Sequence, residues 1–132
     1  FPGSTLGNLE TTQAVALMQV MAEEMGDRGA ALIGIDLVKE TARLEAAYND
    51  AAGVTAAFTL NLLDRINREL DADFDLAGFA HQARFNADAG RIETHLVSGA
   101  AQQVRVAGER FAFAAGEAML RYAYKTMPNH NK

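Results

Sequence analysis

The sequence predicts an α/β protein in which the second half of a wound sheet is joined to a lobe of helices and strands. Three patterns point to it. A helical pattern ends at Gly26 and is followed by a continuous apolar run over residues 30–35. A second, strongly amphipathic pattern begins at Val54, and alternating apolar residues follow from His81 onward. A helix followed by a short apolar strand is typical of α/β sheets, whose strands are covered on both faces.

The composition narrows the class of function. The 132 residues are 49% hydrophobic, which suffices for one core, and the net charge of -5 comes without a basic stripe, so we expect no nucleic-acid partner. The apolar runs are shorter than the roughly 20 residues of a membrane span, so no membrane partner is expected. The lack of cysteine and of metal-ligand spacing among the three histidines predicts no metal site and is compatible with the cytoplasm.

The chain opens on FPGSTLGNL, which reads like a strand end followed by a tight loop, and we expect a piece of a longer protein. The two glycines suit either a plain connection or a backbone that approaches a ligand. Asn8 can act as a ligand through its amide or brace the turn. Thr11 or Thr12 is the expected N-cap of a helix that runs to Gly26.

Residues 30–35 are predicted to form a buried strand of a parallel sheet. Asp36 follows at its carboxyl end, where it can cap the next helix or face a ligand, because this edge of an α/β sheet holds the ligand crevice. Residues 41–47 are expected to be helical. Tyr48 stands at the break before Gly53, as a partly buried aromatic residue or as a ligand contact.

A long helix is predicted from Val54, with an apolar face made of residues that recur every four positions, Phe58, Leu62, Ile66 and Leu70, with Leu63 beside them. Asp75 is expected to cap a short helical turn. Residues 81–86 and 91–98 alternate as a hairpin, and residues 102–107 and 110–114 as a second one, which together predict a meander. The segment 118–125 is too short to classify.

Three stretches carry a resemblance to a known family: FPGSTLGNL, DLVKETARLEAAYNDAAGVTAAF from Asp36 to Phe58, and NRELDADFDL with RIETHLVS. Together they resemble the C-terminal part of the histidine Nα-methyltransferases of ergothioneine biosynthesis, from Phe1 to about Lys125. The resemblance implies a Rossmann-like methyltransferase core over residues 1–40. It also implies an inserted α+β substrate-binding lobe over 41–115, and a return segment and tail over 116–132.

The resemblance also implies roles for single residues. The asparagine of the first motif, Asn8, contacts the substrate amino acid. Tyr48 is a second substrate contact and the expected catalytic residue, which holds the substrate amine or helps to deprotonate it. Gly3 lies near the cofactor, S-adenosylmethionine, whose main binding motif is expected upstream of this chain. The fragment alone is therefore expected to be inactive.

The chain departs from the family at two further substrate contacts. Thr94 stands where the family usually has methionine, and Tyr122 lies in a segment that lacks the glutamate and serine with which the family binds imidazole. A hydrogen bond to a carboxylate is worth roughly 1.5–3 kcal/mol, so we expect weak histidine binding.

The sequence therefore predicts part of a methyltransferase that acts on the amino group of histidine or a related amino acid. The alternative is a non-catalytic binding or assembly module of the same descent. Such a module would pair through an exposed sheet edge, for example as a homodimer.

Overall fold

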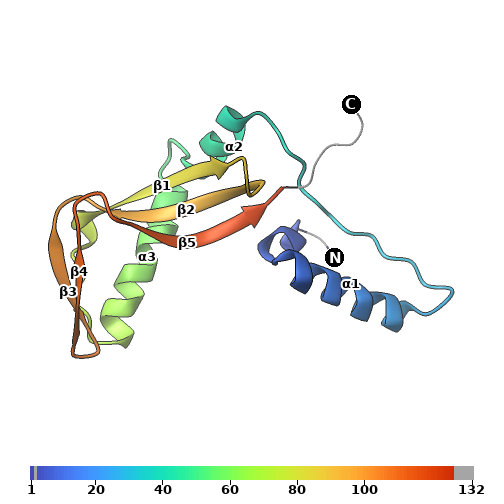
Figure 1. Ribbon diagram of the computed structural model, residues 1–132, viewed down its shortest axis with the longest axis horizontal. Helices are drawn as coiled ribbons and strands as arrows, with labels where there is room; N and C mark the ends of the chain where they lie inside the picture. Colours follow the sequence, from blue (N-terminus) through green and yellow to red (C-terminus); the bar gives the residue numbers. More distant parts are fainter. Residues whose placement is uncertain (2, 127–132) are drawn as a thin grey trace.

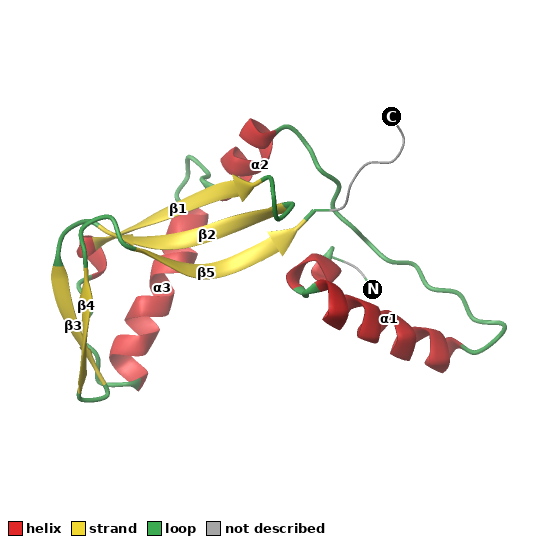
Figure 2. Cartoon of the chain, in the orientation of Figure 1, coloured by secondary structure: helices red, strands yellow, loops and turns green. Residues whose placement is uncertain are grey.

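The computed structural model describes residues 1 and 3–126, without the side chains of residues 120 and 121. Residues 2 and 127–132, the latter including the end of the predicted return segment and tail, lie outside the described residues. The chain combines helices with antiparallel sheets (Figures 1 and 2). The elements are η1 (Thr5–Asn8), α1 (Thr11–Met25), α2 (Thr41–Tyr48), α3 (Val54–Glu69), η2 (Leu76–Gly78), β1 (Phe79–Asn86), β2 (Arg91–Ser98), β3 (Gln102–Val106), β4 (Glu109–Phe113) and β5 (Ala118–Lys125).

Both predicted hairpins are present, but the meander is wrong. β1, β2 and β5 form one antiparallel sheet, while β3 and β4 pair only with each other. The chain leaves the first sheet after Ser98 and returns at Glu117, since the Ser98 amide donates to the Glu117 carbonyl at 2.9 Å. The β3–β4 hairpin is therefore inserted between two neighbouring strands, and the segment that resisted classification is the third strand of the sheet.

α3 lies across one face of the three-stranded sheet (Figure 1). Leu63 of α3 is only 1% exposed, and it packs in a cluster with Phe74, Phe79, Leu96 and Val104. The predicted apolar face is confirmed at Leu63 and at Ile66, which packs against this cluster. It is wrong at Phe58, which is 64% exposed while its neighbour Thr59 is buried. Burial of Thr59 is possible because its hydroxyl donates to the Thr55 carbonyl at 2.8 Å.

The strand predicted over residues 30–35 does not form. This segment is extended, and Leu32 is 89% exposed. Its described backbone partner is Phe1, whose amino group donates to the Leu32 carbonyl and whose carbonyl accepts from the Gly34 amide. That alternation is the pattern of parallel strands. A strand of a parallel sheet needs neighbours along its whole length, and within residues 1 and 3–126 no such neighbours are present.

α1 forms where expected, with a different cap. Glu10, rather than Thr11 or Thr12, is the N-cap residue, and its amide donates to the Gln13 side chain at 3.0 Å. The helix has no buried residue, and Val15 is 49% exposed. Among the described residues, no helix has the length and apolar character to cross a membrane.

Candidate functional site

A cavity of about 370 Å³ lies between the end of α2, the first turns of α3 and the strands β2 and β5. Tyr48, Thr94 and Tyr122, three of the four predicted substrate contacts, line it. The fourth, Asn8, accepts a hydrogen bond from the Tyr122 hydroxyl through its side-chain oxygen. Residues more than 110 positions apart in sequence therefore meet at one place. The remaining lining residues are Ala47, Thr55, Phe58 and Thr59.

The lining is aromatic and hydroxylated, and it contains no charged side chain among the described residues. Such a surface offers stacking faces and neutral hydrogen-bonding groups. Among the described residues, this lining offers no carboxylate to accept an N–H group. The cavity suits a small, partly apolar ligand that needs no charged partner in this wall.

Tyr48 is held in place by the way α2 covers the edge of β1. The His81 Nε2 donates to the Tyr48 carbonyl at 2.8 Å. The Asn49 amide accepts from the Ala83 amide and donates to the Ala83 carbonyl, both at 2.9 Å. The Phe85 amide donates to a Glu45 carboxylate oxygen at 2.9 Å. The side chains of Glu45 and of Asn49, the residue after α2, thus satisfy the edge of the sheet as a neighbouring strand would.

The tyrosine hydroxyls are neutral at physiological pH. Burial, and then the neighbouring Tyr122, Tyr124 and Asp36, raise the pKa of Tyr48 to about 12. Burial also raises the pKa of Tyr122, with Tyr124 adding to the shift and the Asn8 hydrogen bond opposing it. A phenol with so high a pKa donates and accepts hydrogen bonds but does not take up a proton near pH 7. Such a hydroxyl can hold a ligand by hydrogen bonds but does not act as a general base near pH 7.

Thr94 lies opposite Tyr122 in the β2–β5 pairing and is buried. Its hydroxyl donates to the Tyr122 carbonyl at 3.4 Å, a long hydrogen bond. The register between the two strands shifts directly after Thr94. Irregularities of this kind re-aim side chains next to sites. The position at which the chain departs from the family is therefore in the wall of the cavity.

Gly3 and Asp36 are not part of this wall. Gly3 borders a separate, shallow cavity of about 490 Å³ with Phe1, Leu32, Ile33 and Gly34. Of the two alternatives for Asp36, capping of the next helix is wrong, because Glu40 is the N-cap of α2 and Asp36 pairs with Lys39 instead. Asp36 stays close enough for its charge to contribute to the raised pKa of Tyr48.

Sequence reasoning missed Phe58, Thr55 and Thr59 as cavity residues and His81 as a support of Tyr48. The sequence predicts Phe58 in the apolar face because apolar residues recur at every fourth position. That repeat predicts an apolar stripe on the helix but does not say which stripe faces the core. The threonines at positions 55 and 59 were the available signal, since their four-residue spacing puts two hydroxyls on one helix face.

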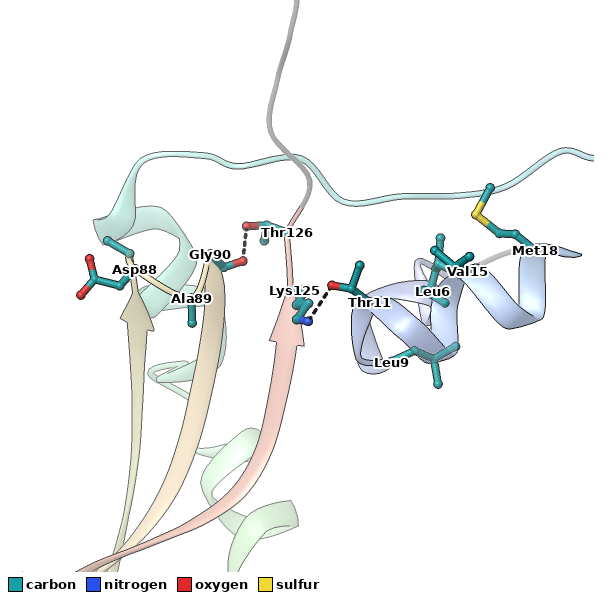
Figure 3. Close-up of a pocket in the computed structure, with 12 residues that line it drawn as sticks. Leu6, Leu9, Thr11, Val15, Met18, Asp88, Ala89, Gly90, Lys125 and Thr126 are labelled. Atoms are coloured by element: carbon teal, nitrogen blue, oxygen red, sulfur yellow. Dashed lines mark hydrogen bonds between the residues drawn. The ribbon is translucent and has the colours of Figure 1, made fainter.

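A further cavity, of about 480 Å³, lies where the apolar face of α1 approaches the β1–β2 turn (Figure 3). Leu6, Leu9, Val15 and Met18 line it. Across residues 1 and 3–126, no group of three or more histidine or acidic side chains is arranged to hold a metal ion.

The cavity at Tyr48 has the volume and the mostly apolar lining that are typical of small-molecule sites. Residues 1–126 match the family described as histidine-specific, S-adenosylmethionine-dependent methyltransferases, and the chain belongs to this family. The resemblance of its motifs to the histidine Nα-methyltransferases of ergothioneine biosynthesis is thereby confirmed.

Curated relatives agree with this assignment. A histidine N-alpha-methyltransferase of Mycolicibacterium smegmatis is 50% identical over 122 residues, and that of Mycobacterium tuberculosis is 46% identical over the same length. Each match covers 91% of this chain and 38% of the relative. Ergothioneine biosynthesis protein 1 of Neurospora crassa is 35% identical over 65 residues, 49% of this chain and 7% of its own length. The chain therefore spans well under half of the proteins that it resembles.

Proposed function

We propose that this chain supplies the amino-acid-binding part of a methyltransferase that transfers a methyl group from S-adenosylmethionine to the α-amino group of histidine or a related amino acid. One observation carries the proposal: Asn8, Tyr48, Thr94 and Tyr122, expected from their sequence motifs, converge on one cavity and its rim. Membership of the family supplies the reaction class.

In this proposal the chain binds and orients the substrate. The Asn8 amide holds the polar end of the amino acid, and the neutral Tyr48 hydroxyl holds its amine. Correct positioning of the amine is the main contribution that protein groups make to such a transfer. The predicted catalytic role of Tyr48 is retained in this form, as a hydrogen-bonding group rather than a base, because its pKa is raised to about 12.

The described residues do not by themselves fit the cofactor. The cavity beside Gly3 is lined by apolar residues and glycines, and no side chain there can accept the hydrogen bonds of ribose hydroxyls. We propose that Gly3 borders the cofactor, and that its main binding groups belong to the rest of a longer, Rossmann-like protein. The parallel pairing of Phe1 with the 32–34 segment supports this arrangement.

The domain boundaries stay predictions: core to residue 40, lobe over 41–115, and return segment from 116. β5 pairs with β2 of the lobe and its end contacts η1, so the return segment would belong to both parts.

Calorimetric titration of the full-length protein tests the proposed function. The cofactor and each of the twenty standard amino acids in turn serve as probes. At least one amino acid should bind, and Tyr48→Phe should weaken its binding by about 5- to 10-fold, since one hydrogen bond is lost. Thr12→Ala, an exposed hydroxyl outside the cavity, is the control. Binding of no amino acid would refute the proposal, and tight histidine binding would refute the expected change of specificity.

The rival assignment is an assembly module. Exposed apolar residues on α1 and in the extended segment, among them Val20, Leu32 and Ile35, call for a cover. The longer relatives favour the remainder of the same chain as that cover, and a second copy is the alternative. Light scattering of the full-length protein separates them. A monomer supports the methyltransferase proposal, whereas a dimer dissociated by Leu32→Asp supports edge pairing.

A further inference from the structure

Gly7 marks the place where η1 meets β5. It is buried, and a Cβ atom at this position would lie 2.5 Å from the Lys125 carbonyl oxygen and 2.8 Å from the Tyr124 ring. Such distances are far below van der Waals contact, and one of the two atoms belongs to strand backbone, which cannot move aside cheaply. Glycine is therefore required at this position by close approach of two backbones.

Glu10 ties the same loop to the same sheet by charge. One of its carboxylate oxygens accepts from Lys125 Nζ at 2.8 Å, and the other lies 3.5 Å from Arg91 Nη1. Lys125 and Arg91 are directly opposite each other on β5 and β2. Lys125 also reaches the Thr11 hydroxyl at 3.3 Å, in the first turn of α1 (Figure 3). The two cations lower the pKa of Glu10, chiefly through the Lys125 hydrogen bond.

Asn8 lies between these two attachments in the sequence. It belongs to η1, follows Gly7 directly and precedes Glu10 by two residues. Its side-chain oxygen accepts from Tyr122, three positions before Lys125 on the same strand. The position of Asn8 over the cavity thus depends on how closely η1 approaches the end of β5.

We propose that Gly7, Glu10, Arg91 and Lys125 form a loop lock, which fixes Asn8 against Tyr122 and so sets the shape of the amino-acid site. Gly7 and Glu10 are positioning residues, acting through Asn8. The lock rests on the proposed function for its purpose, but its existence is a property of the fold. Because the ion pairs are exposed, the close packing at Gly7 is the stronger attachment.

Two measurements on the full-length protein test the lock. The first is amide hydrogen exchange of residues 5–9 without ligand, which reports local opening. The second is the Kd for L-histidine and for L-phenylalanine by calorimetry. Gly7→Ala should speed exchange and raise Kd by at least about 10-fold, and Glu10→Gln by about 3-fold. Lys125→Met should change the exchange of residues 5–9 and the Kd as much as Glu10→Gln does, while leaving the cap of α1 intact. High salt screens the ion pairs, so it should bring the exchange rate and the Kd of the wild type toward those of Glu10→Gln.

Matched variants serve as controls. Gly99→Ala places a Cβ no nearer than 3.4 Å to its neighbour, and Glu69→Gln removes a surface ion pair with Arg65. Neither should change exchange of residues 5–9 or Kd. The lock would be overturned if residues 5–9 exchanged at the same rate in Gly7→Ala and Glu10→Gln as in these controls. Faster exchange with unchanged Kd would overturn its positioning role. If the wild type bound neither amino acid, this would count against the positioning of Asn8 for a ligand. The exchange of residues 5–9 would still decide whether the lock exists.

Discussion

The lobe from α2 to β5 and the first forty residues use their apolar side chains in opposite ways. In the lobe, α3 and both sheets enclose Leu63, which is 1% exposed, and Ile92 is fully buried. In the first part, α1 buries no residue and Leu32 is almost fully exposed. Both parts have clear sequence patterns, yet only one has a core. A pattern specifies a packed element only where the partner for its apolar face is present.

The backbone shows the same contrast. The edge of β1 is satisfied by Glu45 of α2 and by Asn49, which directly follows α2, and its other side is satisfied by β2. The extended segment 30–35 has paired backbone groups only at Leu32 and Gly34 among the described residues. Unpaired strand edges are costly in isolation, so this segment is expected to gain its structure from a neighbour.

The largest effect should come from Leu63→Ala in the core of the lobe. Removing a fully buried leucine side chain costs about 2–5 kcal/mol through lost burial and the cavity left behind. Val15→Ala in α1, where the side chain is about half exposed, should cost less than about 1 kcal/mol. Urea unfolding followed by circular dichroism measures both. Equal losses for the two variants would mean that the first part is packed in solution, and the contrast between the parts would fail.

Tyr122→Glu tests the cavity where the two parts meet. A carboxylate at this position can accept the imidazole N–H, and such a charged hydrogen bond is worth about 1.5–3 kcal/mol. Histidine binding to the full-length protein should therefore tighten by about 10- to 100-fold, as measured by calorimetry. Tyr122→Gln, which is polar but neutral, is the control. A similar gain with glutamine, or none with glutamate, would show that Tyr122 does not face the substrate ring.

The elements of the lobe were predictable because each carries a local signal. Gly53 and the Asn49-Asp50 break separate α2 from α3, and four turn residues, 87–90, separate β1 from β2. On α3, the burial of Thr59 in place of Phe58 was not predictable from the period of the apolar residues. Thr59 is buried because its hydroxyl bonds within the helix, a compensation that the apolar pattern does not contain. The pairing of β5 with β2 was not predictable either. It depends on where the chain leaves the three-stranded sheet to form the separate β3–β4 hairpin.

The site was predictable only through motifs. Asn8 and Tyr48 have ordinary local explanations, as a turn residue and a partly buried aromatic residue. What places them at one cavity is the long-range packing of η1 on β5 and of α2 on β1. The close approach at Gly7 leaves no periodic signature, because a glycine in a loop reads the same whether it meets solvent or a strand backbone.

A smaller effect is expected from Asn49→Ala, which uncovers the edge of β1. The variant loses two hydrogen bonds to the Ala83 backbone and leaves those groups to water or unpaired. We expect a loss of about 1–2 kcal/mol in the free energy of unfolding, measured with urea. Asn61→Ala, an exposed position on α3, should leave stability unchanged or slightly raised, because alanine favours the helix. Equal effects of the two would mean that α2 does not serve as the edge partner of β1.

The smallest effect should come from Asp50, which caps the start of α3. Its carboxylate accepts from the Val54 and Thr55 amides, both at 2.8 Å. Hydrogen bonds from the Thr55 side chain and from these amides lower its pKa from the ordinary 3.8 to about 2. A lowered pKa means that the contribution to stability is complete above about pH 4 and is lost as the pH falls through about 2.

Asp50→Ala should therefore lower the melting temperature by about 2–5 °C at pH 6, as expected for a lost helix cap. The difference from the wild type should shrink between pH 4 and pH 2, because the wild-type carboxylate becomes protonated there. Melting curves of both proteins at pH 6, 4, 3 and 2 measure this difference. Other carboxylates destabilise both proteins alike in acid, so the gap between the curves isolates Asp50. A gap that stays constant down to pH 2 would show that the ionised carboxylate does not hold the end of α3.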